Sequence, residues 1–452
     1  MRIGTNLLIP ICATALCVAA PRDEYKRDFQ KTAALPGGRS LRVEHSLGSV
    51  NVHTQAKNEV NVSAVIQCSA DTQSEAKTFC DQIQIRVDES ASGVTVRTDY
   101  PKTWSRRNLG YSVNLDIAMP QTAPLELRNR FGNVTVQNLY AAGSVNNSNG
   151  NVVVTGARGR QRVENAFGDI EVFSNEGDVV ISGQNGKLRA TDINGAAELS
   201  NRFGDVRAVN ITRGLTLRGN NMRVDVERIG GVADISNSFG DVRILDAKGD
   251  VRVHNQNGKV TVSGITGAAD LANSFAEVRF NGVGKSLTVR AQNSQVSGDT
   301  VGENAVIETS FGGVDLRGVK GGARVTAQNS SIRLVDIAGE AFAKTTFAST
   351  TFENIGGAMT VESQNGSVTV AARPGACKPI VLQTTFSPIS VTVPAGVGYT
   401  VTARTTFGKI RSQADLTLNG QIGEGVIDGK IAGGGCEMRL TGQNSNIDIL
   451  KR

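Results

Sequence analysis

This chain has little of the chemistry that usually marks an enzyme or a metal protein. Aromatic residues make up 5% of its 452 residues, and hydrophobic residues of all kinds reach 39%. It has three histidines, His45, His53 and His254, which are far apart in the sequence. Six cysteines are present without a CxxC pair, and a zinc site needs a closer cluster of such ligands. The sequence therefore predicts no catalytic residues, no metal site and no cofactor.

Concentrated charge of one sign is also missing. Charged residues make up 20% of the chain, both signs are interspersed, and the formal net charge is +6. Nucleic-acid binding depends on a dense basic patch that neutralises phosphates. We therefore expect no nucleic-acid partner and a mixed, well-solvated surface.

The only long apolar run lies at the start of the chain. Arg2 precedes the apolar residues 7–20, which end in small side chains, as in a secretory signal peptide. This run is too short to span a membrane comfortably. We predict a signal peptide over residues 1–19, an unordered mature N-terminus over 20–38, and no transmembrane segment in the mature chain. The protein is expected to be exported, and to be periplasmic, outer-membrane-associated or extracellular.

Removal of that segment leaves four cysteines, Cys68, Cys80, Cys377 and Cys436. In an oxidising compartment such residues form disulfides. The simplest pairing joins Cys68 to Cys80 and Cys377 to Cys436, although the sequence alone allows three pairings.

A repeat dominates the middle of the chain. Phenylalanines recur every 36 residues, at Phe131, Phe167, Phe203, Phe239, Phe275, Phe311 and Phe347. Asparagines stand midway between them, at Asn149, Asn185, Asn221, Asn257, Asn293, Asn329 and Asn365. The repeat unit is therefore half of the spacing between phenylalanines, in two alternating forms, which is typical of a solenoid.

Each unit has the pattern of two short strands. Apolar residues stand three and five positions after the Phe or Asn, as at Val242 and Ile244, with polar residues between them. A glycine about ten positions after the Phe or Asn precedes a second alternating pair, such as Val251 and Val253. This period of two indicates half-buried strands, and stacked copies bury the face that one copy cannot bury alone. The predicted fold is all-β, a parallel β-solenoid.

The sequence leaves two coil lengths open, about 18 and about 36 residues, because either one or two repeat units could form a coil. Two positions after each Phe or Asn, acids alternate with bases, as in Asp205, Arg223, Asp241 and Lys259. The shorter coil makes these charges neighbours of opposite sign, whereas the longer coil stacks acid on acid. We therefore favour the coil of about 18 residues, which predicts about eighteen coils and a length of roughly 85 Å.

The repeat divides the rest of the chain. We assign regular solenoid coils to residues 129–372 and, because the spacing slips afterwards, irregular coils and a cap to 373–452. Residues 39–128 form a less regular β-rich region with one helix over 72–83, since Thr72 and Glu75 make a capping-box pattern.

The order of these segments resembles a known family. The opening LRVEHSLGSVNVHT, the strand SVNLDIAMP, the GDVRV-type repeats and the closing GKIAGGGCEMRLTGQNSNIDI are similar to the bacterial putative-adhesin family of exported β-solenoid domains. The resemblance implies a cell-envelope protein with no established activity and no catalytic residues to transfer.

The repeated residues are interpreted as structural. We expect the phenylalanines to fill a corner of the core, and the asparagines to form amide ladders or to bind turn amides. The predicted function is a non-enzymatic adhesin or envelope protein that binds a glycan or a surface protein. The alternatives are a β-helical polysaccharide lyase or hydrolase and a periplasmic scaffold or sensor module.

Overall fold

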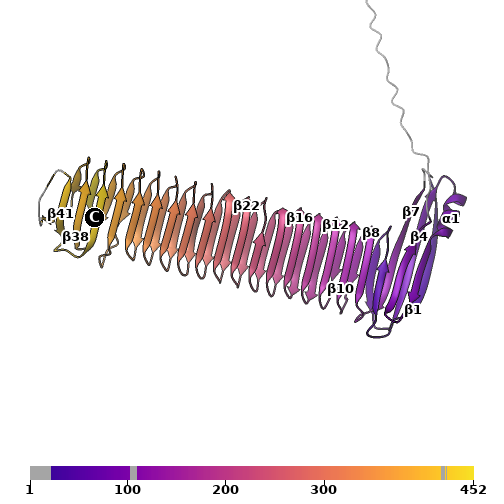
Figure 1. Cartoon of the computed structure of the whole chain (residues 1–452). Coiled ribbons are helices and arrows are strands. Elements are labelled where there is room, and N and C mark those ends of the chain that lie inside the picture. Colours follow the sequence, from indigo (N-terminus) through magenta and orange to yellow (C-terminus); the bar gives the residue numbers. More distant parts are fainter. Residues whose placement is uncertain (1–21, 102–108, 419–422, 424) are drawn as a thin grey trace, which may run out of the picture.

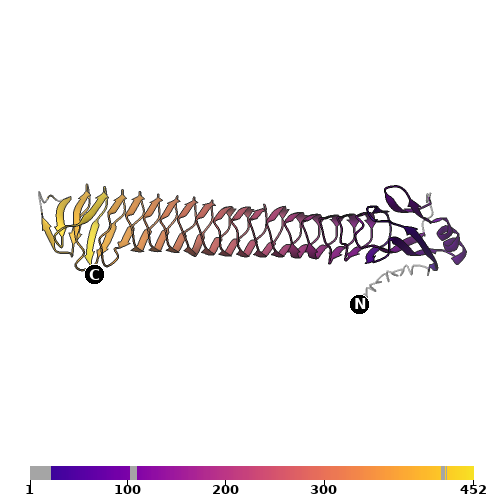
Figure 2. The same ribbon diagram turned by 90° about the horizontal axis from the view of Figure 1, so that it is seen from below.

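The structure, a computed structural model, is a long roll of two parallel β-sheets wound about one axis (Figure 1). It describes residues 22–101, 109–418, 423 and 425–452, so the predicted signal peptide lies outside the described residues. Strands account for 64% of the residues that the structure describes, and the solenoid has about fifteen turns of about 18 residues. The view from below shows the two sheets joined by short turns from one end of the rod to the other (Figure 2).

The pairing of strands confirms the shorter of the two coil lengths. Ile170 lies between Val152 and Leu188 in the second sheet, and Val163 lies between Val145 and Ile181 in the first. Each residue is therefore stacked on the equivalent residue of the next repeat unit, whether that unit carries Phe or Asn. The longer coil is excluded.

Each regular coil contributes one strand to each sheet. The strands of the first sheet are β8 (Leu125–Phe131), β10 (Gly143–Asn149), β12 (Gln161–Phe167), β14 (Val179–Asn185), β16 (Ala197–Phe203), β18 (Leu215–Asn221), β20 (Ala233–Ser236), β22 (Val251–Asn257), β24 (Ala269–Phe275), β26 (Leu287–Ala291), β28 (Ala305–Thr309), β30 (Ala323–Ala327), β32 (Ala341–Thr345), β34 (Met359–Ser363) and β36 (Ile380–Thr384). The strands of the second sheet are β9 (Val134–Gln137), β11 (Val152–Thr155), β13 (Ile170–Glu176), β15 (Leu188–Asn194), β17 (Val206–Ile211), β19 (Val224–Ile229), β21 (Val242–Ala247), β23 (Val260–Ile265), β25 (Val278–Val283), β27 (Val296–Val301), β29 (Val314–Val319), β31 (Ile332–Ile337), β33 (Thr350–Ile355), β35 (Val368–Ala371) and β37 (Ile389–Val393).

The core is a thin layer of aliphatic side chains between the two sheets. Val226, Ile235, Val253 and Val262 are at most 2% exposed, as are their counterparts in neighbouring coils. Burying a side chain of this size is worth about 1.5–3 kcal/mol relative to leaving it exposed. Because each coil covers the next, the stack supplies the burial that an isolated coil lacks.

Glycine at the turn from the first sheet into the second has a steric cause. Gly168 follows Phe167 with φ +115°, and a Cβ there would lie 2.3 Å from the carbonyl oxygen of Gly150 in the preceding coil. A side chain would therefore clash with the backbone below it and strain the dihedral. This explains the FG and NG pairs of the repeat.

The N-terminal end continues the solenoid out of chain order. The strands β2 (Ser40–Glu44) and β3 (Val50–Gln55) form a coil between β8/β9 and the coil of β6 (Gly93–Asp99) and β7 (Gly110–Pro120). Antiparallel strands then close both sheets, β5 (Gln84–Glu89) beside β6 and β4 (Glu59–Ala70) beside β7.

The prediction of an unordered segment over residues 20–38 is wrong. Asp23–Ala34 form the strand β1, which pairs antiparallel with β4 along its whole length. Its charged composition hid the strand pattern, because Arg27 and Lys31 donate hydrogen bonds to the carbonyls of Ile83 and Val87 instead of facing away from the protein. Tyr25 and Phe29 on the same face pack against the core.

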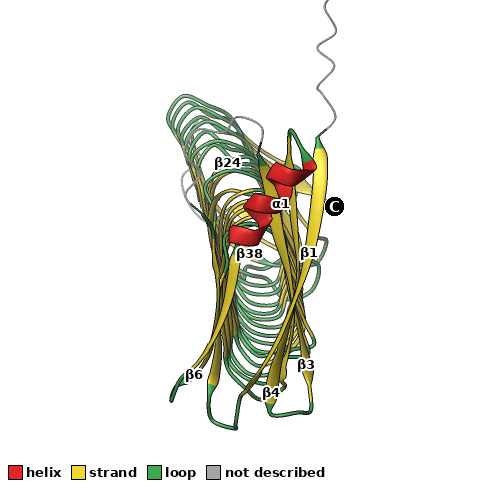
Figure 3. Ribbon diagram, turned by 90° about the vertical axis from the view of Figure 1, so that its right-hand side faces the viewer, coloured by secondary structure: helices red, strands yellow, loops and turns green. Residues whose placement is uncertain are grey.

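The single predicted helix is present beside this end. The helix α1 runs over Gln73–Gln82, with the Thr72 side chain accepting a hydrogen bond from the backbone N–H of Glu75. Its buried residues are Ala76 and Cys80, and it lies at the N-terminal end of the roll when the molecule is viewed along its axis (Figure 3).

The C-terminal end is also out of chain order. The strands β42 (Cys436–Gly442) and β43 (Ile447–Lys451) form a coil directly on β36 and β37. The earlier strands β38 (Tyr399–Thr405) and β39 (Ile410–Ser412) lie outside that coil. The strands β41 (Val426–Ile431) and β40 (Leu416–Leu418) close the first sheet with antiparallel pairing. Fifteen coils, from β8/β9 to β36/β37, follow one another in chain order, fewer than the predicted eighteen, and the coils beyond them at both ends are out of chain order.

Candidate functional site: the Phe/Asn edge and the groove beside it

The repeated phenylalanines lie on the surface, so the prediction that they fill the core is wrong. All seven are between 45% and 61% exposed, and Phe386 and Phe407 near the C-terminus are 58% and 80% exposed. They lie at the turn from the first sheet into the second. Side chains alternate along the strand, but the chain turns at the residue after the Phe, which directs the ring out of the roll.

The buried polar ladder belongs to a different residue, which the sequence interpretation missed. Asparagine stands two positions before the Phe or Asn in many coils and is at most 5% exposed. These residues are Asn129, Asn147, Asn165, Asn201, Asn237, Asn255 and Asn273. The strand period of two places this position inside the roll, so the repeated NxFG and NxNG patterns were a usable signal.

These buried amides join neighbouring turns. Nδ2 of Asn255 donates hydrogen bonds to the carbonyl oxygen of Gly258 in its own coil, at 3.1 Å, and to that of Gly240 in the preceding coil, at 3.3 Å. Asn147 and Asn165 make the same pair of contacts. Among the described residues, the Oδ1 atoms of the series have no hydrogen-bond partner except that of Asn165. The ladder therefore gives the turn carbonyls hydrogen-bond donors, but it leaves most of its own buried Oδ1 atoms without a donor, which costs free energy.

The predicted asparagine series has a smaller structural role. Asn149 and Asn185 are half-buried, and their Nδ2 atoms donate long hydrogen bonds of 3.3 and 3.5 Å to the carbonyls of Arg130 and Ala166. Asn293 and Asn329 have positive φ angles of 43° and 48° at the turn. These residues alternate with the phenylalanines on one edge, which we call the Phe/Asn edge.

The alternation on this edge survives the change of chain order at the C-terminal end. Phe386 donates its backbone N–H to Gln364 of the preceding coil, Asn444 donates to Thr385, and Phe407 donates to Gln443. The order in space is therefore Phe347, Asn365, Phe386, Asn444 and Phe407. The uneven spacing of the last phenylalanines, which breaks the repeat in the sequence, disappears in the structure. Along the whole edge, phenylalanines recur at every second coil, about 10 Å apart.

A polar groove runs along the first sheet beside this edge. Two hollows of about 580 and 450 Å³ share Thr326 and Gln328, and together they extend from His254 to Thr385. Amide side chains of one coil alternate there with hydroxyl side chains of the next, and Phe347 lies at the margin. The repeated lining residues are Ser274, Gln292, Ser310, Gln328, Thr346, Gln364 and Thr385.

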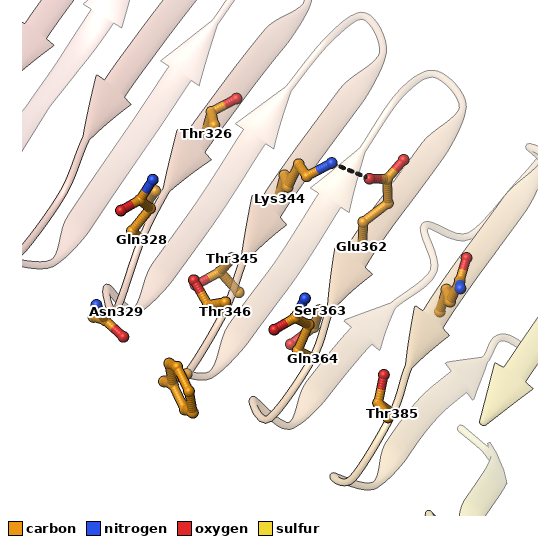
Figure 4. A pocket seen from close by; sticks show the side chains of 13 residues that line it. Thr326, Gln328, Asn329, Lys344, Thr345, Thr346, Glu362, Ser363, Gln364 and Thr385 are labelled. Carbon is orange, nitrogen blue, oxygen red and sulfur yellow. Dashed lines mark ion pairs between the residues drawn. The ribbon is translucent and has the colours of Figure 1, made fainter. Parts of the chain in front are cut away.

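Figure 4 shows the C-terminal part of this groove. Lys344 Nζ lies 2.9 Å from Glu362 Oε2, and Gln328, Thr346 and Gln364 extend along the strands toward the turns. Glu308 and Glu362 are the carboxylates that line the groove, and they are three coils apart, about 14 Å. Glycosidases place their two carboxylates roughly 5 to 9.5 Å apart, so these two do not make such a pair.

The alternating charges behind the phenylalanines are stacked as predicted. Oδ1 of Asp169 accepts the backbone N–H of Lys187 at 2.8 Å, and Oδ1 of Asp241 accepts that of Lys259 at the same distance. Lys259 Nζ also lies 2.8 Å from Glu277 Oε2, and its hydrogen bond is the main cause of the lowered pKa of Glu277. Asp169 and Asp241 therefore bind the backbone of the next coil, whereas Glu277 pairs with the charge of Lys259 in the preceding coil.

The histidines are not brought together. His45 is 5% exposed, and its Nδ1 and Nε2 atoms lie 3.0 Å from Thr98 Oγ1 and 2.9 Å from the carbonyl oxygen of Val113. Burial lowers its pKa to about 4, so the ring is neutral at physiological pH. His53 lies 3.5 Å from Asp116 on the surface, and His254 lines the polar groove. No group of three or more metal-binding side chains occurs within the described residues.

The cysteines form the two simplest pairs. Cys68 and Cys80 are joined with an S–S distance of 2.10 Å, and Cys377 and Cys436 with 2.07 Å. The first disulfide attaches α1 to β4. The second attaches the start of β42 to the loop before β36. No helix in the described part of the chain is long and apolar enough to cross a membrane.

The fold and its edge define the chain as an elongated β-solenoid with a repeated surface. Neither a protein-family model nor a curated protein sequence matches it. A solved structure of a putative cell adhesion protein from Clostridium sporogenes is 8% identical, with 95% of this chain and 100% of that chain covered and a TM-score of 0.17. A putative adhesin from Bacteroides fragilis is 11% identical, with 63% of this chain and 97% of that chain covered and a TM-score of 0.24.

A putative adhesin from Parabacteroides merdae is 9% identical, with 68% of this chain and 96% of that chain covered and a TM-score of 0.19. All three carry names of the kind that the sequence resemblance implies. Similarity at this level carries no argument about what this chain binds.

Proposed function

We propose that this chain is an exported, non-enzymatic rod of the adhesin type that binds an extended glycan in the polar groove. The observation that supports this proposal is the composition of the groove, in which amide and hydroxyl side chains alternate beside exposed phenylalanine rings. Amides both donate and accept hydrogen bonds, as sugar hydroxyls do. Aromatic rings supply the apolar surface that a binding site for such a ligand combines with a few polar groups.

The shape of the groove favours a polymer over a small molecule. It follows the first sheet through eight coils, from His254 to Thr385, which corresponds to about 34 Å. It is open along its side and repeats the same side-chain types every second coil. A chain with a repeating unit makes the same contacts again at each repeat, so weak contacts add up along the groove.

Two features support the absence of catalysis and the export. The distance between Glu308 and Glu362 does not suit a pair of glycosidase carboxylates, and Lys344 neutralises Glu362. Two disulfides are typical of proteins outside the reducing cytoplasm. Adhesion or envelope organisation is the role that fits an exported rod of this kind.

The test is binding of the mature chain to a panel of neutral and acidic polysaccharides. Replacing Gln328 and Gln364 by Ala removes two sets of amide contacts, at about 1 kcal/mol each, so the affinity should fall about tenfold or more. Gln184→Ala is the matched control, because Gln184 has the same place in its coil but lies outside the groove. Binding of no polysaccharide, or equal binding by the double variant, would overturn the proposal.

A further inference from the structure

We propose that two copies of this chain associate side by side, in opposite directions, through the part of the Phe/Asn edge between residues 131 and 329. This pairing goes beyond the proposed glycan binding. The paired segment overlaps the N-terminal part of the polar groove, from His254 to Gln328, whereas the C-terminal part of the groove and three phenylalanines, Phe347, Phe386 and Phe407, lie beyond it. Four properties of the edge point to a second copy as the occupant: its area, its shape, its charges and its period.

The exposed apolar area is large for a surface that faces only water. The segment carries Phe131, Phe167, Phe203, Phe239, Phe275 and Phe311, each about half exposed. At about 200 Å² per aromatic side chain, they expose roughly 600 Å² of ring in one line. This matches the largest patches found on monomers, and with the residues beside the rings it approaches the roughly 800 Å² per partner of a standard interface.

The shape of the edge is complementary to itself. A large ring protrudes at every second coil, and a smaller asparagine lies at the coil between. A copy displaced by one coil therefore places its rings in the gaps of the other. The fit lasts over many coils only if the partner has the same distance between successive coils. A second copy of this chain has that distance because it has the same fold.

The charges next to the edge follow the same alternation. From Phe167 to Phe275, the coils that carry Phe have an acid two positions after the ring, and the coils that carry Asn have a base two positions after the Asn. These residues are Asp169, Asp205, Asp241 and Glu277, and Lys187, Arg223 and Lys259. When one copy is displaced by one coil, its Phe coils face the Asn coils of the other copy, and its acids face the other copy's bases. The charges therefore favour this register over the one in which rings face rings.

Symmetry selects the direction of the second copy. In a parallel pair with a two-fold axis along the rods, each Phe meets the same Phe of the other copy, and the charged rows of the two copies lie on opposite sides of the contact. In an antiparallel pair the two charged rows lie on the same side, where they can meet.

The register of the antiparallel pair follows from the position of its two-fold axis. An axis between Asn221 and Phe239 sets Phe239 of one copy against Asn221 of the other. The charged pairs that result are Asp241 with Arg223 and Asp205 with Lys259. The same axis sets Glu277 against Lys187 and keeps the interface within residues 131–329.

The first experiment is sedimentation velocity on the mature chain and on two variants. The wild type should be a dimer. Replacing Phe203, Phe239 and Phe275 by Ser should weaken the dimer at least a hundredfold, since central apolar residues dominate such interfaces. Phe347→Ser, which lies outside the paired segment, should leave the dimer unchanged. A monomeric wild type at 100 μM, or a triple variant that stays dimeric, would overturn the proposal.

The second experiment uses the charges and excludes effects inside one chain. The variant Arg223→Asp with Lys259→Asp has an acidic row, and the variant Asp205→Lys with Asp241→Lys has a basic row. Each alone should be monomeric, whereas an equimolar mixture should form a heterodimer. Association of either variant alone, or no association in the mixture, would contradict the antiparallel register.

Other occupants of the edge give different results. If the triple Phe→Ser variant loses polysaccharide binding while the wild type remains monomeric, a glycan covers the edge and the pairing proposal fails. Because the readout of the pairing is molecular mass, its failure is distinguishable from a failure of glycan binding, which the Gln328→Ala and Gln364→Ala variant tests separately.

Discussion

The two halves of the rod fill the same buried position with different side chains. In the N-terminal half, up to Asn273, the position two before the turn residue holds mostly asparagine, which bridges the carbonyls of successive turns. In the C-terminal half it holds Ala291, Thr309, Ala327, Thr345 and Ser363. The register of the strands continues across this boundary, although the strands of the first sheet then end two residues earlier, before the Phe or Asn. Aliphatic stacking and backbone pairing therefore define the coil, and the polar ladder is an addition that one half uses.

The surfaces of the halves differ as well. The N-terminal half has a nearly regular glycine turn and alternating charges, whereas the C-terminal half has Ser331, Ser349 and Ser367 at the charged position. Most of the polar groove lies in the C-terminal half. The same repeat thus carries two kinds of edge. Antiparallel strands close both ends, but the N-terminal end adds a helix with a short disulfide loop and the C-terminal end a long disulfide loop.

The largest expected effect concerns the disulfides at the two ends. Cys377→Ser with Cys436→Ser opens a loop of 59 residues and should destabilise the C-terminal end by about 4 kcal/mol, on the chain-entropy estimate. Cys68→Ser with Cys80→Ser opens a loop of 12 residues and should cost about 3 kcal/mol. Hydrogen exchange of the end strands measures both effects. A larger loss at the N-terminal end would reverse this ranking.

The next effect contrasts the turns of the two halves. Gly258 has φ +141°, and a Cβ there would lie 2.1 Å from the carbonyl oxygen of Gly240. Gly258→Ala should therefore cost about 3 kcal/mol in unfolding free energy. Ala348 occupies the same place in its coil, five coils on, and Ala348→Gly should cost about 1 kcal/mol or less. Equal losses in a denaturant titration would show that the two turns do not differ.

A pH effect should be confined to the N-terminal end. The pKa of His45 is lowered to about 4 by burial, so the unfolded chain takes up a proton near pH 6.5 while the folded chain does not. Stability should therefore be full above pH 6.5 and fall by up to about 3 kcal/mol as the pH drops to 4.

His45→Gln removes this titration and is the control. Hydrogen exchange at pH 7 and pH 4.5 should show the loss around β2 and β6 in the wild type and a smaller one in the variant. The C-terminal end has no histidine after His254. If both ends lose protection equally, His45 is not the cause.

The smallest effect tests the buried ladder itself. Asn255→Ala removes two amide hydrogen bonds, one to the carbonyl of Gly240 and one to that of Gly258, and should cost about 2 kcal/mol, although Asn237 and Asn273 still donate to these carbonyls. Thr345→Ala removes one hydroxyl contact, to Ser330 at 3.1 Å, and should cost about 1 kcal/mol. The ranking is checked by unfolding of both variants, and a costlier Thr345→Ala would contradict it.

The sequence predicted what depends on the alternation within strands and on the length of the repeat unit. These periods follow from strand geometry and stacking, so Val242, Ile244 and their counterparts were placed correctly in the core. The cap of α1 was also predictable, because Thr72 and Glu75 are neighbours in sequence.

Other features were not predictable from local patterns. The ring of Phe239 points outward because of the turn that follows it, and a count of spacing does not contain that direction. Asp23–Ala34 looked unordered because its charged residues find partners far away in sequence. The position of Asn444 between Phe386 and Phe407 depends on the swapped order of the end coils, which a one-dimensional repeat does not show.

The account depends on one repeat unit forming one coil, with all coils stacked in one straight rod. Spin labels on Asn146→Cys and Arg290→Cys, which lie eight coils apart on the outer face of the first sheet, measure this directly by pulsed electron resonance. With labelled protein diluted in unlabelled protein, the account predicts a distance of about 38 Å. A distance near half that value, or a broad distribution without a maximum, would contradict the stack.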